Sequence, residues 1–371
     1  MQIFLYLFVL AGLAVADIFD FHGVQSSQWY LLTVGALLAI GLYSSTYGIP
    51  LSEMRTHAKL ILKAITVGVF LKAAIIGAVM ALVLQNPIGF IFGVVVAQID
   101  PLATAALEGK RMSKSAQAII RAWSSFDDPM TVIMALYVPV AIAFFVGTSW
   151  EPIRGTLQDV GLAGYVLETG INILFAAGIF LLWQLMKRHS KATNYLVLVL
   201  VALGMYGLLV GALSIAVYYF WMLGIALLGL FMRPPIVKAI ERGLHWALSI
   251  AAVLLGILLV NGIAIWKGIA LGVAAYVAQI VVGFLLTRKL PRSDRWHIAF
   301  AQQNGITAII LALLFETYHS GTVAIVGPAI IVINTLHWAA NKALDAYLER
   351  DFTKLHPRHH AKRLRAHMHK I

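Results

Sequence analysis

Three aspartates lie inside long apolar stretches of this 371-residue sequence, where a charged side chain is costly. Asp127 and Asp128 are adjacent, and Asp100 lies in an earlier apolar stretch. Two close carboxylates in a low-dielectric site do not both ionise easily, so such a pair can hold a proton. When ionised, the same oxygens can bind a hard cation such as Na⁺. The pair therefore predicts a site at which a proton and a monovalent cation compete.

The two adjacent acids are expected to have different partners. Neighbours on a helix point about 100° apart, because a helix has about 3.6 residues per turn. If Asp127 and Asp128 lie on one helix, one can face a cavity while the other faces a partner helix. Two purely structural acids at this depth would need two nearby basic groups, and the sequence offers few.

Two polar sequences predict breaks in membrane-spanning helices. Asp is favoured at the N-cap and Pro at the first helical position, so Asp100-Pro101 indicates a helix that stops and restarts. Gln302, Asn304 and Gly305 interrupt a second apolar segment without any charge. Irregular backbone at membrane depth persists only where it faces protein or a water-filled cavity. Both breaks are therefore expected inside the protein.

The composition agrees with a membrane setting. Apolar residues make up 61% of the chain, charged residues 12%, and no cysteine is present, while the mean hydropathy is +0.86. An ordinary soluble domain is about 45–50% apolar and about 25% charged. This composition excludes a soluble enzyme and a disulfide scaffold, and the missing thiols exclude cysteine nucleophiles and thiolate zinc sites. The sequence predicts an all-α polytopic membrane protein.

About 12 transmembrane helices are expected from the apolar stretches, at about 20 residues each. They are predicted at residues 1–17, 28–47, 59–84, 87–108, 113–147, 163–186, 193–211, 212–232, 235–260, 262–287, 296–317 and 321–345. An alternative for residues 1–16 is a cleaved signal, since Ala14-Val15-Ala16 resembles a cleavage site, but the preceding run carries no Lys or Arg.

The loop charges predict the orientation. One alternating set of connections carries most of the Lys and Arg residues outside the C-terminal tail, and the other set carries only Arg154. Basic loops remain cytoplasmic, so a multi-pass protein of the cell membrane with both termini in the cytoplasm is expected. The net charge of +12 is assigned to these loops and to the basic tail, residues 346–371, facing membrane lipid. No soluble domain is expected that could bind nucleic acid.

Two three-helix units have matching polar breaks. Asp100 lies 41 residues into residues 59–147, and Asn304 lies 42 residues into residues 262–345. The two units begin on opposite sides of the membrane in the predicted orientation. This pattern predicts an inverted repeat whose two broken helices cross near the middle of the bilayer.

These motifs resemble the monovalent cation:proton antiporter superfamily. The likeness lies in the Asp-Pro break within 98–107, the acid pair within 126–130 and the Gln-Asn-Gly break within 302–309. It implies a core domain at 59–147 and 262–345, and scaffold or dimerisation helices at 1–58 and 148–261. It also implies a homodimer in which the core moves against the scaffold.

The resemblance also implies roles for individual residues. Asp128 corresponds to the acid that binds the cation and the proton, Asp127 to its neighbour that often pairs with a basic residue, and Asp100 to the acid of the crossed helices. The chain departs from the usual pattern where relatives carry a basic group. In the tenth helix the only basic residue is Lys267, which is expected near the surface, and the position at midplane depth is Gln279. In the second break the position of the basic residue is Asn304. Lys72 and Arg121 are other possible partners of the acids.

The leading hypothesis is therefore a secondary transporter that exchanges Na⁺, Li⁺ or K⁺ for protons at Asp128, with no enzyme activity and no cofactor. One alternative keeps the fold but carries an organic anion coupled to a cation, and would need a larger cavity. A remote alternative is an intramembrane aspartyl protease, which needs two acids sharing a proton from separate helices. The Gly-x-Gly-Asp motif of such proteases is missing from the sequence.

Overall fold

The computed structural model describes residues 2–19, 23–49, 58–100, 112–146, 161–189, 195–233 and 237–355, and within these ranges the regular structure is entirely helical. Seven of the described helices are long and apolar enough to cross a membrane, and shorter apolar helices lie between them. The predicted all-α polytopic architecture is confirmed.

The helices follow the predicted order. They are α1 (Gln2–Phe19), α2 (Gln28–Tyr47), α4 (Ala58–Lys63), which continues through a π turn (Ala64–Gly68) into α5 (Val69–Leu84), α6 (Gly89–Val96), α8 (Lys114–Val146), α9 (Gly161–His189), α10 (Tyr195–Tyr218), α11 (Met222–Phe231), α12 (Val237–Leu259), α13 (Ile265–Leu286), α14 (Arg292–Ala299), α15 (Ile306–Glu316) and α16 (Thr322–Leu355).

Two predicted boundaries were wrong. The expected division between residues 211 and 212 falls instead after Tyr218, where Tyr219, Phe220 and Trp221 separate α10 from α11. Phe220 has a left-handed φ of 59°, and the rings of Tyr219 and Trp221 stack at 5.0 Å. The left-handed turn at Phe220 therefore ends α10, and the Trp221 N–H bonds back to the Ala216 carbonyl at 2.7 Å. Helix α16 runs to Leu355 rather than to residue 345. The apolar span ends near residue 345, but the polar residues after it continue the helix outside the membrane.

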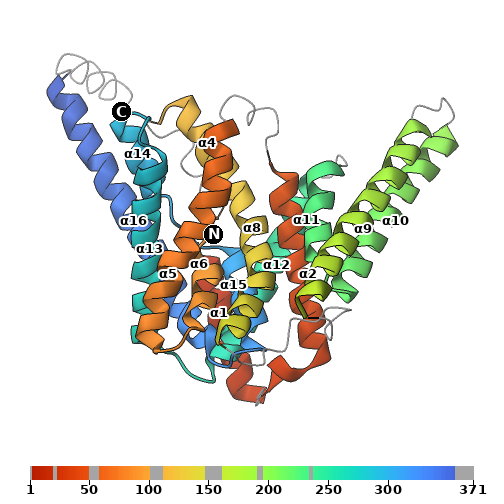
Figure 1. Cartoon of the computed structure of the whole chain (residues 1–371), viewed down its shortest axis with the longest axis horizontal. Coiled ribbons are helices and arrows are strands. Elements are labelled where there is room, and N and C mark those ends of the chain that lie inside the picture. The colour runs from red at the N-terminus through yellow and green to blue at the C-terminus, as the bar shows by residue number, and fades with distance from the viewer. Residues whose placement is uncertain are drawn as a thin grey trace, which may run out of the picture.

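Both predicted helix breaks are present. Helix α6 ends at Val96, and residues 97–100 are not helical. Helix α14 ends at Ala299, and residues 300–305 separate it from α15. Each break lies between two long helices, α5 and α8 in the first unit, and α13 and α16 in the second (Figure 1). Pro101 itself lies outside the described residues.

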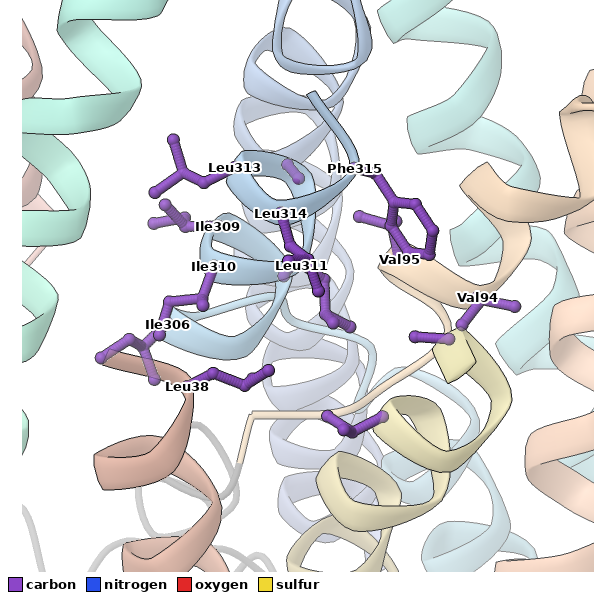
Figure 2. Packing of buried hydrophobic residues seen from close by; sticks show 14 of the residues in the cluster. Leu38, Val94, Val95, Ile306, Ile309, Ile310, Leu311, Leu313, Leu314 and Phe315 are labelled. Carbon is purple, nitrogen blue, oxygen red and sulfur yellow. The ribbon is translucent and has the colours of Figure 1, made fainter. Parts of the chain in front are cut away.

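Helix α15 lies at the centre of the molecule. Its sequence is apolar on every side, which is typical of a helix surrounded by protein. All eight residues from Ala308 to Phe315 are buried. Figure 2 shows Leu38 of α2 packing near Ile306 at one end of α15, and Val94 and Val95 of α6 near Phe315 at the other. The second break is therefore tied to the core of the fold.

Pro129 in α8 and Pro328 in α16 each leave a carbonyl oxygen that another helix satisfies. Proline has no N–H, so the carbonyl four residues earlier loses its helical donor. For Pro328 this oxygen belongs to Ala324, and it accepts the Ala264 N–H, at the start of α13, at 2.9 Å. Gly268 permits this close approach, since a Cβ there would lie 2.5 Å from Pro328 Cγ. These contacts fix α13 against α16.

Candidate functional site

The two helix breaks meet through their backbones. The N–H of Asp100 donates to the carbonyl of Gln303 at 2.9 Å. The chain from α6 thus crosses the chain that leads into α15, as the sequence predicts. Because both segments are irregular there, each offers backbone groups that a continuous helix would have used internally.

Neutral amides satisfy the open carbonyl end of α6. The Gln302 Nε2 atom donates to the carbonyls of Val96, at 3.0 Å, and Gln98, at 2.9 Å, and also to Asn304 Oδ1, at 2.9 Å. Asn304 Nδ2 adds a bond of 3.2 Å to the Val96 carbonyl. The partial negative charge at this helix end is therefore met by amide donors rather than by a cation.

A second amide pair anchors the break to α16. Asn334 Oδ1 accepts the Asn304 N–H at 3.1 Å, and Asn334 Nδ2 donates to the Asn304 carbonyl at 3.2 Å. One side chain of α16 thus satisfies both backbone groups of Asn304. This fixes the position of the Asn304 backbone between α6 and α16.

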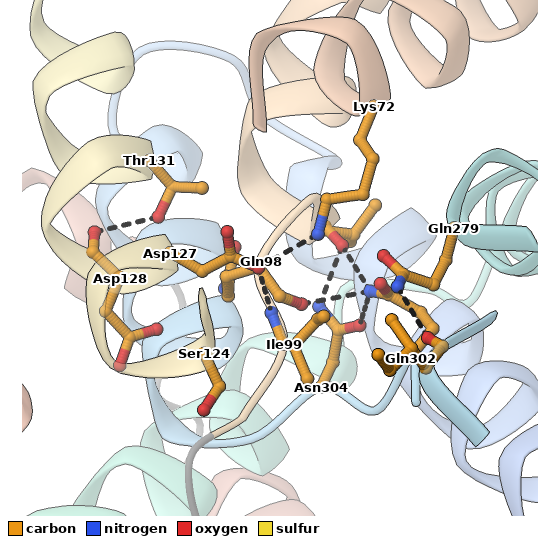
Figure 3. Close-up of polar contacts among 12 residues, drawn as sticks. Lys72, Gln98, Ile99, Ser124, Asp127, Asp128, Thr131, Gln279, Gln302 and Asn304 are labelled. Atoms are coloured by element: carbon orange, nitrogen blue, oxygen red, sulfur yellow. Dashed lines mark hydrogen bonds and ion pairs between the residues drawn. The ribbon is translucent and has the colours of Figure 1, made fainter. Parts of the chain in front are cut away.

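Asp127 forms a buried ion pair with Lys72 of α5. The Lys72 Nζ atom lies 2.9 Å from Asp127 Oδ2, and both side chains are fully buried. The same oxygen accepts the Ile99 N–H of the first break at 2.9 Å, and the ammonium lies 5.3 Å from the Trp123 ring centre. The pair therefore joins α5, α8 and the first break in one network, which Figure 3 shows.

Asp128 faces the other way. In Figure 3 its carboxylate points away from Lys72. The groups that act on its carboxylate include Asp100 from the first break, Ser45 from α2 and Thr307 from α15. The two adjacent acids thus have separate surroundings, as their helical spacing predicts, and only Asp127 has a lysine paired with it among the described residues.

Asp100 occupies the space beside Gly305. A Cβ added to Gly305 would lie 1.9 Å from Asp100 Oδ2, so this carboxylate packs directly onto the second break. Asp100 is also 8% exposed. Glycine is required at 305 because no other residue would leave room for the carboxylate.

Several buried polar atoms of the site have no hydrogen-bond partner within the described part of the chain. They are Asp127 Oδ1, Asp128 Oδ1, both amide atoms of Gln98, Gln279 Oε1 and Gln302 Oε1. Buried polar atoms are nearly always satisfied by protein, water or an ion. Carboxylate and amide oxygens suit a hard monovalent cation or a hydrated proton. The described part of the chain contains no group of three or more His, Cys, Asp or Glu residues that could hold a fixed metal ion.

The structure brings most of the predicted site residues together and separates one. Gln98, Asp100, Asp127, Asp128 and the second break converge in one buried region. Lys267 does not reach this region, because it is exposed near the start of α13. Gln279 is fully buried and donates through Nε2 to the Ile298 carbonyl of α14 at 2.9 Å, so it supports the second broken helix.

The partner of Asp127 could not be chosen from the sequence. Lys72 was one of several possible partners there, and its identification requires the packing of α5 against the first break. Ser45 and Thr307 were not expected at the site, because a serine or threonine in an apolar helix has no distinctive spacing. Pro129 offers a partial signal for Ser45, since it leaves the Ser125 carbonyl without a helical donor.

Comparison with known proteins identifies the family and the fold of the chain. A family model described as "Sodium/hydrogen exchanger, transmembrane" matches residues 4–335. Among solved structures, the chain is similar to the sodium proton antiporter MjNhaP1 from Methanocaldococcus jannaschii, with a TM-score of 0.63 and 16% identity over 91% of this chain and 92% of that one. At this identity the likeness shows a shared fold. No curated protein sequence matches the chain.

Proposed function

The chain belongs to the sodium/hydrogen exchanger family, and we propose that it exchanges Na⁺ for protons by alternating access, with both ions competing for Asp128. The family and the similar structure are transporters, so this protein is a transporter rather than an intramembrane protease. The observation that carries the proposal is the buried Asp128 carboxylate, which has one oxygen without a hydrogen-bond partner among the described residues, while Asp100 of the first break contacts the second break.

The charges around the acid pair support this assignment. Lys72 balances Asp127 within 2.9 Å, so that pair is neutral overall and has little need of a transported ion. Asp128 has no such cation beside it among the described residues. Either a proton or a monovalent cation would neutralise the charge of Asp128. If one of them left and the other did not replace it, an isolated buried carboxylate would remain, which is energetically costly.

The proposed movement separates a core from a scaffold. The core is residues 59–147 and 262–345, and the scaffold is residues 1–58 and 148–261. Helix α2 of the scaffold packs against α8 and α15 of the core. The polar contacts across this boundary within the described residues include the Tyr30 Oη donating to the Leu313 carbonyl at 2.8 Å and the Ser45 Oγ donating to the Ser125 carbonyl at 3.0 Å. We expect these contacts to break and reform as the core moves against the scaffold.

The test is proton flux in proteoliposomes with an imposed pH gradient and a pH-sensitive dye. Addition of Na⁺ should dissipate the gradient, with Li⁺ and K⁺ compared at the same concentration. Asp128→Asn should abolish the response because an amide cannot carry the exchanged proton. Asp17→Asn, a change at an exposed aspartate of α1, is the matched control and should retain wild-type flux.

Competition for one site has a separate signature. The apparent KM for Na⁺ should fall as pH rises, while the maximal rate changes less. If no alkali cation dissipates the pH gradient in wild-type vesicles, the proposal is wrong. If the gradient is dissipated only when an organic anion is added together with a cation, the alternative of a cation-coupled organic-anion carrier is favoured.

We also propose the orientation with both termini in the cytoplasm of a cell. The chain has no cysteine, so single cysteines can be placed and labelled without background. Lys289→Cys, between α13 and α14, and Ser320→Cys, between α15 and α16, are both at exposed positions. A membrane-impermeant maleimide applied to intact cells should label the second and spare the first. The reverse pattern would invert the orientation.

We also propose that the protein forms a homodimer whose interface is made by α9 and α10. These two helices extend away from the rest of the bundle (Figure 1). Their outer faces expose large apolar side chains, including Leu174 at 73% and Leu203 at 63%. Lipid and a second scaffold would both cover such a surface. Mass measurement in detergent should give a dimer, and Leu174→Arg with Leu203→Arg should give a monomer if this hairpin is the interface.

A further inference from the structure

The ammonium of Lys72 has a second contact besides Asp127. It lies over the ring of Trp123, 5.3 Å from the ring centre, while its Nζ is 2.9 Å from Asp127 Oδ2. Trp123 precedes Asp127 by four residues, so the two side chains lie on one face of α8, one turn apart. Lys72 and Trp123 are both fully buried. Helix α8 therefore holds the ammonium at two points, and the ion pair is only one of them.

The fold leaves room for this ring against α5. Gly68 ends the π turn and precedes Lys72 by four residues. A Cβ added to Gly68 would lie 3.1 Å from Trp123 Cζ2 and 2.9 Å from Leu286 Cδ1. A larger residue at this position would therefore crowd the indole. The ring contacts the face of α5 that carries both Gly68 and Lys72.

A ring face suits a buried ammonium beside several acids. Aromatic faces attract cations most strongly where water is excluded. A carboxylate in place of Trp123 would add a further negative charge to a region that already buries Asp100, Asp127 and Asp128. The indole holds the cation without adding charge, so the balance between Lys72 and Asp127 is kept.

We propose that Trp123 is a positioning residue that holds the Lys72 ammonium on the Asp127 side of α8 and so keeps it from occupying Asp128. The Asp128 carboxylate points away from Lys72 (Figure 3) and has one oxygen without a hydrogen-bond partner among the described residues. A lysine carries its ammonium on a flexible four-carbon stem. An ammonium released from the ring would thus have a second acid one residue further along α8. The inference rests on the proposed antiport, since an ammonium at Asp128 would exclude Na⁺.

The first experiment measures the Na⁺ dependence of exchange in proteoliposomes for wild type, Trp123→Leu and Trp338→Leu. Loss of the Trp123 ring should raise the apparent KM for Na⁺ about tenfold, the size expected for a desolvated contact of this kind. The maximal rate at saturating Na⁺ should change little, because excess Na⁺ displaces a competing ammonium.

Trp338 is the matched control. Lys342 Nζ lies 4.8 Å from its ring centre, so the same kind of contact is lost in Trp338→Leu. This ring is 60% exposed, where water weakens the attraction, and its lysine is a different one. Trp338→Leu should therefore keep the wild-type KM.

A second background separates positioning of the ammonium from packing. In the double variant Lys72→Met with Asp127→Asn, the buried ammonium is absent, so adding Trp123→Leu should no longer raise the KM. If the ring only filled space, Trp123→Leu would have the same effect on KM in both backgrounds.

Fluorinated tryptophan provides a test that keeps the shape of the ring. Incorporated throughout the protein, it weakens the negative ring face while the ring stays nearly the same size. It should raise the KM for Na⁺ in wild type and not in the double variant that lacks Lys72 and Asp127. This substitution keeps the test available if Trp123→Leu fails to fold.

Binding of Na⁺ can also be measured without transport. A ligand that binds the folded state raises the melting temperature in proportion to its affinity and concentration. The Na⁺ concentration needed for a given rise in detergent should be about tenfold higher for Trp123→Leu than for wild type. The same comparison in the double variant should show no difference, and it decides the matter if that variant binds Na⁺ without exchanging it.

The outcomes distinguish the two proposals. If wild-type vesicles show no cation-dependent proton flux, the antiport proposal fails. If wild type exchanges ions and Trp123→Leu has the wild-type KM, antiport stands and the role of Trp123 is rejected. An equal rise in KM with and without Lys72 would also reject it, as would a lower maximal rate at unchanged KM, because both patterns indicate damaged packing.

Discussion

The ammonium of Lys72 lies 2.9 Å from Asp127 Oδ2 with both side chains fully buried, and this pair leaves the adjacent Asp128 without a lysine of its own in the described structure. Two acids that are neighbours in sequence are thereby given different environments. One carboxylate is held by a fixed cation and by the backbone of the first break. The other has no lysine paired with it, and among the described residues each of the two carboxylates has one oxygen without a hydrogen-bond donor.

Removing one member of this pair should be more harmful than removing both. Lys72→Met leaves Asp127 as an uncompensated buried charge and should cost about 3–5 kcal/mol of stability. Asp127→Asn in the same chain should recover most of that loss, since neither charge then remains. Thermal unfolding in detergent measures both. A double variant no more stable than Lys72→Met would show that the pair is not what stabilises this region.

Gly305→Ala should disable the site through Asp100. The added methyl group would lie 1.9 Å from Asp100 Oδ2, so either the carboxylate or the break must move. We expect ion exchange to fall at least tenfold, with a loss of stability of about 1–3 kcal/mol from overpacking. Gly243→Ala on α12 is the control, because its nearest neighbour is Ile40 Cγ2 at 4.0 Å. Equal activity of both variants would contradict the close packing at the break.

The stability of the protein should depend on the hydrogen-bond donor of the Gln302 side chain more than on the size of that side chain. Gln302→Glu keeps the shape but replaces an amide that serves the Val96 and Gln98 carbonyls with an acceptor. The Gln98 carbonyl would lose this donor and the Val96 carbonyl would keep only Asn304 Nδ2, at about 1–3 kcal/mol for a buried group left unsatisfied. The melting temperature of Gln302→Glu should therefore fall below that of wild type. A melting temperature unchanged at neutral pH would contradict the role of the amide.

His319, between α15 and α16, should make stability depend on acidity. Burial lowers the pKa of this imidazole below its ordinary value, and the nearby Lys267 lowers it further. Since the folded state disfavours the charged form, stability should be full above the unfolded-state pKa of about 6.5 and fall as pH drops below it. His319→Gln should flatten this part of the stability curve. Lys267→Gln should reduce the slope less, because the lysine is the smaller cause.

The sequence was sufficient for the architecture and for the buried position of the three aspartates within it. Runs of apolar residues long enough to span a bilayer define the helices, and Asp100 and Gly305 mark the breaks because such residues inside apolar segments disrupt helical hydrogen bonding. These are local properties of the chain. The boundary after Tyr218 escaped prediction, because the helix ends at a left-handed phenylalanine, Phe220, rather than at a proline, a glycine or a polar run.

The identity of the residues that balance each charge had to come from the folded chain. Lys72 and Asp127 are 55 positions apart, and no period or motif links them. The same holds for Ser45 and the carbonyl freed by Pro129. Contacts of this kind depend on which faces of separate helices meet, and that is set by the packing of the whole bundle around α15 rather than by any one stretch of residues.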